Sequence, residues 1–349
     1  MNDFRIDTQQ PDLQRADAQP LTQQQLDPQY LDRPHMGPIR AFASSIKWLG
    51  AYLLAFFAYL GVEIVAELVF GRIPALNQGA GLMVNVCCQL SVTLVFGLWM
   101  AWLRPRSFAR QRALERPLSW GSETTVARVI LILELAVVLY VVVSVGTDLF
   151  WSLFPDMLES YAEGMEASGT NDLNLASFLT VSVGAPIAEE LVVRGVFFEF
   201  ILRAFNAQSC WQWKRSRRDA LADQAPTDAP VRGCGHTVTP ATFWLANIVQ
   251  ALTFGVMHGN LVQGSYTFFC GLIFGWVMWR TGRLRYNMLL HFGFNTVSFV
   301  AAYFIVDGGV FLLLETVGSV VAAVLAARYF DRACCEEPKQ PLGAHAVRP

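Results

Sequence analysis

The 349-residue chain is 54% hydrophobic and only 15% charged, and its formal net charge at neutral pH is −2. A soluble domain normally carries about a quarter charged residues, so the composition excludes an ordinary soluble protein. The hydrophobic residues gather in runs long enough to cross a bilayer, which takes roughly 20 mainly apolar residues as a helix. Helices satisfy their own backbone polar groups in lipid, so we predict an all-α fold, a polytopic membrane helix bundle.

The chain begins with a polar arm, residues 1–45, that is rich in Gln, Asp and Pro. It lacks the apolar stretch of a signal peptide, and it has too little apolar surface to offset its chain entropy, so we expect it to be disordered. A membrane domain of about eight helices follows over residues 46–330, and residues 331–349 form a short polar tail. The predicted spans are Ile46–Phe70, Gly81–Leu103, Val126–Phe154, Leu175–Phe205, Ala241–Asn260, Tyr266–Arg280 (the shortest), Asn287–Val306 and Val310–Phe330.

Positive charge alternates from one loop to the next along the chain. The loops after the second, fourth and sixth spans and the segment after the eighth are rich in Arg and Lys, whereas the loop after the third span is acidic. Because Lys and Arg collect on the cytoplasmic side, this alternation predicts that both termini are cytoplasmic. Residues 208–239 then form a cytoplasmic loop insertion between the fourth and fifth spans.

The fourth span carries three ionisable residues in an apolar stretch, namely Glu189, Glu190 and Arg194. A charge in the middle of a span costs about 2.5–3.5 kcal/mol on insertion scales, so it usually faces the bundle interior and has a function. Glu190 and Arg194 are four residues apart on one helix face and can pair. Glu189 points about 100° away and has no cation of its own. A spare carboxylate in an apolar site suits a general base or acid.

Two further spans carry polar pairs at helical spacing. Phe254 and His258 share a face at the end of the fifth span, and His291 and Asn295 share a face in the seventh. The chain has five histidines, and only these two fall within predicted spans. A single histidine in a span is often just a helix-to-helix hydrogen bond. Two histidines in separate helices, together with the spare Glu189, indicate a constellation.

The motifs Glu-Glu-x-x-x-Arg, Phe-x-x-x-His and His-x-x-x-Asn, in this order on membrane helices, resemble those of the CAAX protease and bacteriocin-processing (CPBP, or Abi) family. The resemblance covers roughly residues 175–298, and the 208–239 loop lengthens the usual spacing between the first two motifs. It implies an intramembrane endopeptidase that hydrolyses a peptide bond of a membrane-associated peptide or protein.

Amide hydrolysis needs an activated water and stabilisation of the oxyanion. With the resemblance in view, we assign Glu189 as the general base and expect His258 to hold the water, while His291 and Asn295 donate to the oxyanion. We favour a reaction without a cofactor. The supporting residues are Glu190, Arg194 and Phe254.

A zinc-dependent form of the same protease is the alternative. Glu189, His258 and His291 would supply three zinc ligands and leave an open position for water, with Glu190 as the base. The chain has no His-Glu-x-x-His sequence, which is the best-known zinc-protease pattern.

Two non-enzymatic hypotheses stay open. One is a membrane immunity or scaffold protein that binds a partner without catalysis. The other is a transporter or proton relay, which predicts paired repeats and broken helices that the sequence does not show. The expected partners are the lipid bilayer and a membrane-associated peptide or protein, with no nucleic acid. Neither the identity of the substrate nor whether it is prenylated can be inferred from the residues.

We expect the protein in a bacterial inner (cell) membrane, with the active site opening to the cytoplasm. At 1.5 Å per residue, Glu189 lies about 25 Å from the cytoplasmic end of its predicted span. His291 lies only a few residues from the cytoplasmic end of the seventh span. Straight, upright helices would not bring them together, so we expect the fourth and fifth spans to project into the cytoplasm.

Overall fold

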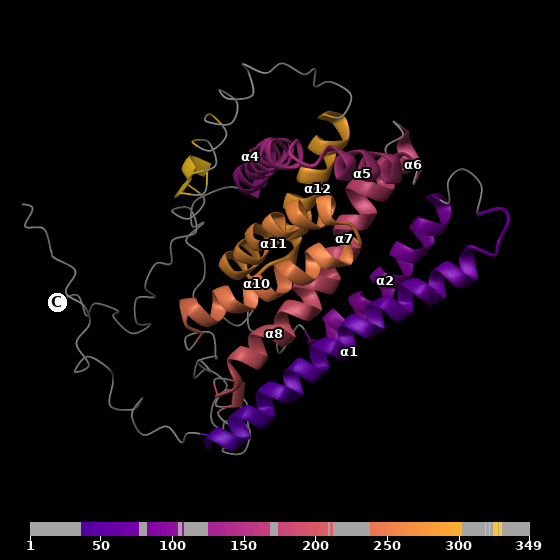
Figure 1. Ribbon diagram of the computed structural model, residues 1–349. Helices are drawn as coiled ribbons and strands as arrows, with labels where there is room; N and C mark the ends of the chain where they lie inside the picture. The colour runs from indigo at the N-terminus through magenta and orange to yellow at the C-terminus, as the bar shows by residue number, and fades with distance from the viewer. Residues whose placement is uncertain are drawn as a thin grey trace, which may run out of the picture. The chain divides into compact units, whose positions relative to one another are not determined.

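The computed structural model describes residues 36–76, 82–103, 107, 125–167, 174–208, 210–211, 238–301 and a few positions between 318 and 329. The described residues belong to one compact unit that begins at Met36. Every regular element in this part of the chain is helical (Figure 1), which confirms the all-α prediction for it. The polar arm up to residue 35, most of the 208–239 loop, most of the predicted eighth span and the tail lie outside the described residues.

Six helices are long and apolar enough to cross a membrane, so the chain is an integral, multi-pass membrane protein. They cover Pro38–Phe70, Leu82–Leu103, Arg128–Trp151, Leu175–Phe205, Pro240–Met257 and Leu261–Thr281. The seventh predicted span is also a helix, α12 (Leu284–Ala301), but it is less apolar. The count of eight spans and the cytoplasmic termini stay predictions.

The helices agree with the predicted spans except at a few ends. The first, α1 (Pro38–Phe70), begins eight residues before Ile46, inside the segment that we assigned to the polar arm. The sixth span, predicted as the shortest, is the 21-residue helix α11 (Leu261–Thr281). The acidic loop after the third span contains a further helix, α5 (Pro155–Ala167), which the sequence analysis did not predict. The remaining long helices are α2 (Leu82–Leu103), α4 (Thr125–Trp151) and α10 (Pro240–Met257).

A tight turn with capping residues on both sides joins α10 to α11. Asn260 caps the start of α11, where its side chain accepts from the Gln263 amide at 2.7 Å. Gly259 just before it has a φ of 71°, a backbone conformation that glycine adopts at little cost. His258 is the C-cap residue that follows the end of α10 at Met257. The turn therefore fixes the position of the histidine at the end of its helix.

The fourth span is a single helix with two π-helical stretches. It runs through α6 (Leu175–Phe178), η4 (Leu179–Gly184), α7 (Ala185–Glu190), η5 (Leu191–Phe197) and α8 (Phe198–Phe205), where η4 and η5 are the π segments. In a π turn the amide bonds the carbonyl five residues back, as between Ala185 and Thr180. Such turns are rare and occur mostly at functional sites. Glu189 and Glu190, the two carboxylates of the motif, are the last two residues of α7, the short α segment that lies between the two π segments.

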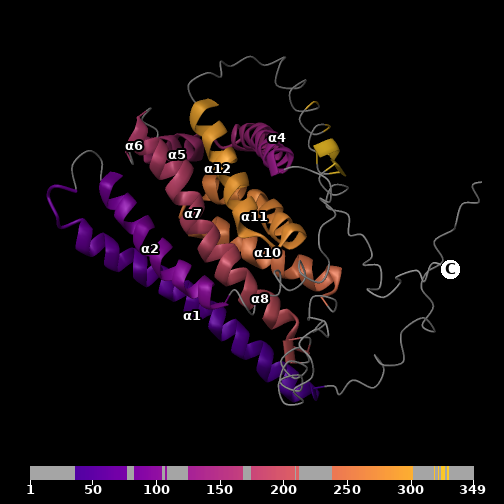
Figure 2. The ribbon, with the colours of Figure 1, turned by 180° about the vertical axis from the view of Figure 1, so that it is seen from behind.

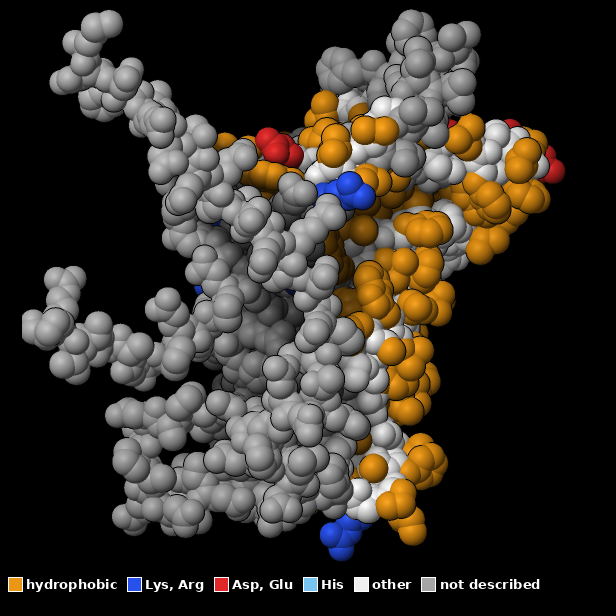
Figure 3. Space-filling model, turned by 90° about the vertical axis from the view of Figure 1, so that its left-hand side faces the viewer, with side chains coloured by type: hydrophobic (Ala, Val, Ile, Leu, Met, Phe, Trp, Pro, Cys, Tyr) orange, Lys and Arg blue, Asp and Glu red, His pale blue; other side chains and the backbone are white. Residues whose placement is uncertain are grey.

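The fourth span lies between two groups of helices. Figures 1 and 2 show α1 and α2 side by side along one flank of α7 and α8, with α10, α11 and α12 on the other, and α4 against α12. Large side chains with little or no exposure, among them Phe96, Phe197 and Phe274, fill the interior. Figure 3 shows hydrophobic side chains over most of the described surface of one face, as a lipid-facing surface requires.

Small residues let α10 and α11 approach closely. A Cβ atom at Gly271 would lie 3.0 Å from both Cα and Cβ of Ala251, and at Gly275 it would collide with the side chain of Asn247. The sequence analysis did not assign these glycines a role in the site. The close approach nevertheless brings the Gly271 carbonyl next to Arg194 of the fourth span, where it accepts a hydrogen bond at 3.3 Å.

Candidate active site

Glu190 is fully buried and is the centre of a hydrogen-bond network that joins two parts of the bundle. Its Oε1 accepts from Arg194 Nη1 at 2.9 Å and from His291 Nδ1 at 3.1 Å, and its Oε2 accepts from Asn287 Nδ2 at 3.2 Å. Asn287 Nδ2 also donates to the Phe274 carbonyl of α11 at 2.7 Å. Glu190 therefore ties the fourth span to α12 and, through Asn287, to α11.

Arg194 compensates the charge of Glu190 and is itself enclosed. Besides the ion pair, its Nη2 donates to the Gly271 carbonyl. Its guanidinium carbon lies 4.4 Å from the ring centroid of Phe254 and 5.1 Å from that of Phe274. Two aromatic faces and a carboxylate make this a favourable site for a buried cation. The two side chains thus pair as the helical spacing predicted, and their supporting role stays a prediction.

His291 lies between the two adjacent glutamates. A carboxylate only accepts hydrogen bonds, so the Nδ1 that lies 3.1 Å from Glu190 carries a hydrogen. The other ring nitrogen, Nε2, lies 3.8 Å from Glu189 Oε2. The ring packs against Phe274, with centroids 4.9 Å apart, and meets Phe254 edge-on. Glu190 thus fixes the ring of His291 so that Nε2 is directed towards Glu189.

Glu189 has a different environment from its neighbour in the chain. Its side chain is about 25% exposed, yet its Oε2 atom is buried and has no hydrogen-bond partner among the described residues. A buried polar atom usually has a partner, so an unpaired carboxylate oxygen calls for an explanation. His291 Nε2 faces this oxygen at 3.8 Å, just beyond hydrogen-bond range.

His258 is held by its own helix. Its Nδ1 lies 2.8 Å from the carbonyl oxygen of Phe254, one turn earlier. A carbonyl oxygen can only accept, so Nδ1 is the donor and Nε2 is the ring atom left for other contacts. The Phe254 and His258 rings also meet edge-on, with centroids 4.9 Å apart. Phe254 is therefore in contact with Arg194, His258 and His291 together.

Asn295 is bound to the first π stretch of the fourth span. Its Nδ2 donates to the Val181 carbonyl at 2.9 Å. In the π pattern this carbonyl would receive the amide of residue 186, but that residue is Pro186, which has no N–H. The proline thus leaves an acceptor to which Asn295 donates one of its two amide hydrogens. The second hydrogen stays available.

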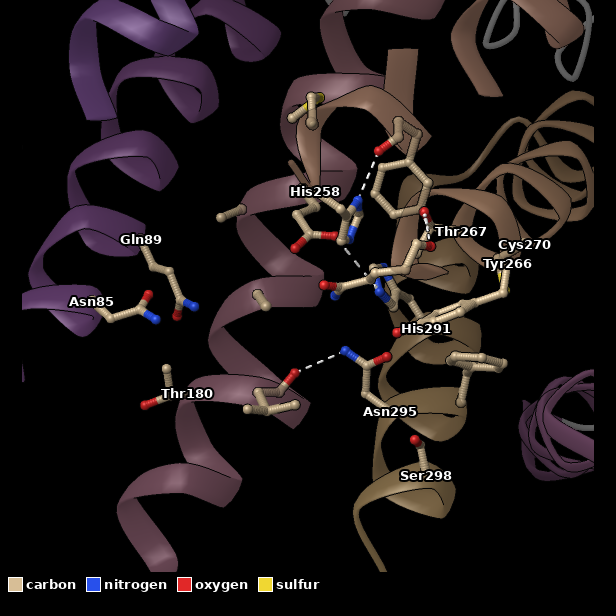
Figure 4. A pocket seen from close by; sticks show the side chains of 18 of the residues that line it. Asn85, Gln89, Thr180, His258, Tyr266, Thr267, Cys270, His291, Asn295 and Ser298 are labelled. Carbon is tan, nitrogen blue, oxygen red and sulfur yellow. Dashed lines mark hydrogen bonds and ion pairs between the residues drawn. The ribbon is translucent and has the colours of Figure 1, made fainter. Parts of the chain in front are cut away.

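Glu189, His258, His291 and Asn295 all line one cavity of about 820 Å³. Figure 4 shows His258, His291 and Asn295 on one side of it and Asn85 and Gln89 of α2 on the other. The cavity floor and rim include residues of η4, α5 and α11, such as Thr180, Tyr161 and Thr267. The structure therefore brings the four sequence-predicted catalytic residues together, with Phe254 in the wall and Glu190 and Arg194 behind it.

The helix α5 closes one edge of the cavity. Tyr161 lines the cavity, and its hydroxyl lies 3.3 Å from that of Tyr266 in α11. Burial raises the pKa of the Tyr161 phenol above its ordinary value of 10.0, so the group is neutral at physiological pH. The Trp151 indole likewise donates to Ser265 at 3.1 Å. The part of the predicted acidic loop that forms α5 thus contributes to the cavity wall.

The sequence analysis missed two residues of this region. Asn287 lies one helical turn before His291, so extending the His291–Asn295 spacing backwards would have found it. Glu63 of α1 also lines the cavity. It is an acid inside the predicted first span, and the argument applied to the fourth span would have singled it out.

The proposed zinc ligands do not form a ligand group in this arrangement. Among the described residues, no group of three or more His, Cys, Asp and Glu side chains is close enough to hold a metal ion. The Nδ1 atoms of His258 and His291 are engaged with the Phe254 carbonyl and with Glu190, which leaves both Nε2 atoms for other partners. The residues that we considered for zinc are thus not grouped closely enough to hold the metal in this arrangement, and we derive no step through it.

The two motifs meet although they lie at unequal distances from their helix ends. Glu190 lies 15 residues before the end of α8 at Phe205, and His291 lies 7 residues after the start of α12 at Leu284. The hydrogen bond between them shows that the convergence does occur. The depth of the cavity and the side to which it opens stay predictions, because no membrane fixes the position of these helices.

A comparison with protein families supports the motif reading. Residues 171–297 match the family model described as Type II CAAX prenyl endopeptidase Rce1-like. No curated protein and no solved structure matched the chain. The matched range contains all the motif residues and begins and ends close to the 175–298 that the motifs indicated. Residues 171–297 thus resemble an Rce1-like CAAX endopeptidase domain, in agreement with the family that the motifs predicted for this segment.

Proposed function

We propose that this protein is an intramembrane endopeptidase in which Glu189 activates the attacking water. The observation that carries the proposal is the unpaired, buried Oε2 of Glu189, which lines a cavity beside His291. The Rce1-like domain supports a peptidase, and the apolar helices support a substrate that reaches the site from the membrane. The general-base role of Glu189 is the finer step that we add.

The first step is attack by water. Glu189 takes a proton from the water, and the oxygen of that water adds to the carbonyl carbon of the scissile amide. The neutral ring of His258 has its hydrogen on Nδ1, which donates to Phe254, so Nε2 can accept a hydrogen bond from the same water. A base within hydrogen-bond reach of the water, with a second group to orient it, meets the geometric requirement for general-base catalysis.

The second step is stabilisation of the tetrahedral oxyanion. The free amide hydrogen of Asn295 and the Nε2 of His291 are the proposed donors, since both residues line the cavity. His291 donates from Nε2 only in its protonated form, because its Nδ1 hydrogen is used by Glu190. Two carboxylates flank that ring, Glu190 at 3.1 Å from Nδ1 and Glu189 at 3.8 Å from Nε2. One donor of this kind contributes about 10²–10³-fold to the rate.

The last step is collapse of the tetrahedral intermediate. Glu189, now protonated, gives its proton to the nitrogen of the leaving amine as the carbon–nitrogen bond breaks. The products are a carboxyl end and an amine, and Glu189 returns to its carboxylate form. One side chain can serve as base and then as acid, because the proton that it removes is the one that the leaving group needs.

The decisive experiment compares the wild type with Glu189→Gln in lipid vesicles that contain a library of membrane-anchored peptides. Products are identified by mass spectrometry. Glutamine preserves the size of the side chain but cannot accept the proton, so we expect cleavage to fall roughly 10²–10⁴-fold. Glu134→Gln is the matched control, because Glu134 is an exposed carboxylate within a candidate span that does not line the cavity. Full cleavage by Glu189→Gln would refute the assignment.

Metal dependence is tested on the same material. The protein is dialysed against a chelator until elemental analysis finds far less than one metal ion per chain, and cleavage is measured again. Retained activity supports the metal-free mechanism. Lost activity that zinc restores would replace it with the zinc-dependent alternative. A wild type that cleaves nothing, together with a Glu189→Ala strain that keeps its cellular phenotype, would favour the non-catalytic scaffold.

A further inference from the structure

The cavity has a second wall that the proposed reaction does not use. α1 contributes Tyr59 and Glu63 to it, and α2 contributes Asn85 and Gln89. Figure 4 shows the two amide side chains projecting from α2 into the space opposite His258 and His291. Gly184 of the fourth span makes room for this approach, because a Cβ atom there would collide with the amide oxygen of Gln89. A substrate in the cavity would lie between the two walls.

The charged side chains that line the cavity are all acidic. Among the residues that line it, the charged side chains are Glu63 and Glu189, one from each wall, and no Lys or Arg is present. The cation behind the wall, Arg194, is engaged through Nη1 with Glu190 and through Nη2 with the Gly271 carbonyl, and it lies against two aromatic rings. The two histidines, His258 and His291, are the remaining basic groups of the lining.

Neither lining carboxylate is paired with a Lys or Arg side chain of the described residues. Glu63 has no hydrogen bond or ion pair with any described residue, and Glu189 has a buried, unpaired oxygen. Their negative charges repel each other across the cavity. Carboxylates at such positions in a membrane protein are costly unless something offsets them, and the usual reason for keeping them is a ligand. Among the described residues, Glu63 has no basic group in ion-pair range, whereas Glu189 has His291 Nε2 at 3.8 Å.

The charged residues of α5, at the edge of the cavity, are negative as well. The helix α5, whose Tyr161 and Met165 line the cavity, exposes acids on its outer face and carries no Lys or Arg. These exposed acids are Asp156, Glu159, Glu163 and Glu166. A positively charged group approaching past α5 would be attracted at every stage, whereas a carboxylate would be repelled.

We propose that Glu63 is a specificity-determining residue that binds a positively charged group of the substrate across the cavity from Glu189. The group is an alkylammonium or guanidinium, from a lysine or arginine side chain or from a free amino end. This inference rests on the proposed function and names its substrate class. A peptide that presents a carboxylate end at this wall would find no Lys or Arg there to pair with.

The test uses peptides that are identical except at one position, which holds Lys, norleucine or Glu. They are anchored by an acyl chain in vesicles of phosphatidylcholine, whose uncharged surface does not itself concentrate cations. Binding is measured by fluorescence in the Glu189→Gln protein, and cleavage is measured in the protein with Glu189 intact. A charge-assisted hydrogen bond predicts about a 10-fold to 100-fold preference for Lys over norleucine. Free and acetylated amino ends on the norleucine peptide separate the two sources of the cation.

Two variants of α1 complete the experiment. Glu63→Gln should abolish the Lys preference, and Glu63→Lys should reverse it in favour of the Glu peptide. Glu67→Gln, one turn further along α1 and outside the cavity lining, is the matched control and should keep the preference. The inference is overturned if Lys and norleucine peptides bind within about twofold, or if Glu63→Gln keeps the preference. Preferential binding without any cleavage would support this site while refuting the proposed protease.

Discussion

The buried pair of Glu190 and Arg194 gives the sharpest test of the site's framework. Arg194→Met removes the cation but keeps much of the side-chain volume. It leaves a fully buried carboxylate whose remaining donors are Asn287 and His291. Breaking a buried ion pair from one side costs about 3–5 kcal/mol, and we expect Arg194→Met near the upper end of that range. Glu190→Gln should lie near the lower end, because an amide oxygen in place of Oε1 still accepts from Arg194 and His291, and only the bond from Asn287 is lost.

The double variant, Glu190→Gln with Arg194→Met, separates the pair from its surroundings. With both charges gone, the loss of stability in the double variant should be smaller than the sum of the two single losses, by on the order of 2 kcal/mol. The measurement is unfolding in mixed micelles as SDS is titrated in. Additive losses, or a loss below about 1 kcal/mol for Arg194→Met, would refute the view that the two charges compensate each other.

The same helix supplies a matched control pair. Glu199 and Arg203 are also four residues apart and buried, with Arg203 Nε 2.7 Å from Glu199 Oε1, and Arg203 lies over the ring of Trp48. This pair does not line the cavity. Glu199→Gln and Arg203→Met should show a similar coupling in stability. Cleavage by the folded protein should fall only for the Glu190–Arg194 variants.

Two further predictions concern packing around the site. Asn287→Leu removes the donor to Glu190 and to the Phe274 carbonyl, and it should cost about 1–2 kcal/mol in the SDS titration; an unchanged midpoint would contradict the network. Gly275→Leu would overlap the side chain of Asn247 and should cost at least about 1–3 kcal/mol, whereas Gly61→Leu, where a Cβ meets nothing within 4 Å, should be close to neutral. Equal losses in the two glycine variants would refute close packing as the cause.

Hydropathy predicted most of the fold because the bilayer imposes a length on each helix. The helices α2 and α4 and the helix that runs from α6 to α8 begin within one residue of the predicted spans and end within three. Hydropathy did not predict the amphipathic helix α5, because this helix is too short and too acidic to cross a membrane. Its role depends on what its Tyr161 and Met165 cover, which is a property of the assembled cavity.

The sequence predicted site residues at positions singled out by two arguments together, the helical spacing of the polar residues and the free-energy cost of a charge inside a membrane span. The separation of Glu189 from Glu190 followed from the rotation of about 100° per residue, and the structure places one in the cavity and the other in the buried network. The π stretches on either side could not be predicted in this way, because they depend on how the helix packs against its neighbours. Nor does the sequence reveal that Pro186 leaves a carbonyl for Asn295, since that depends on the π turn.

Supporting and reacting groups in this cavity are coupled through one ring. His291 touches Glu190 with Nδ1 and faces Glu189 with Nε2, so the supporting carboxylate and the proposed base share a neighbour. A variant of Glu190 therefore changes both the stability of the bundle and the position of a proposed oxyanion donor. Loss of cleavage in such a variant is not evidence that Glu190 acts on the substrate. Only a comparison with Glu189→Gln, at a temperature where both proteins are folded, assigns the proton transfer to one glutamate rather than to the other.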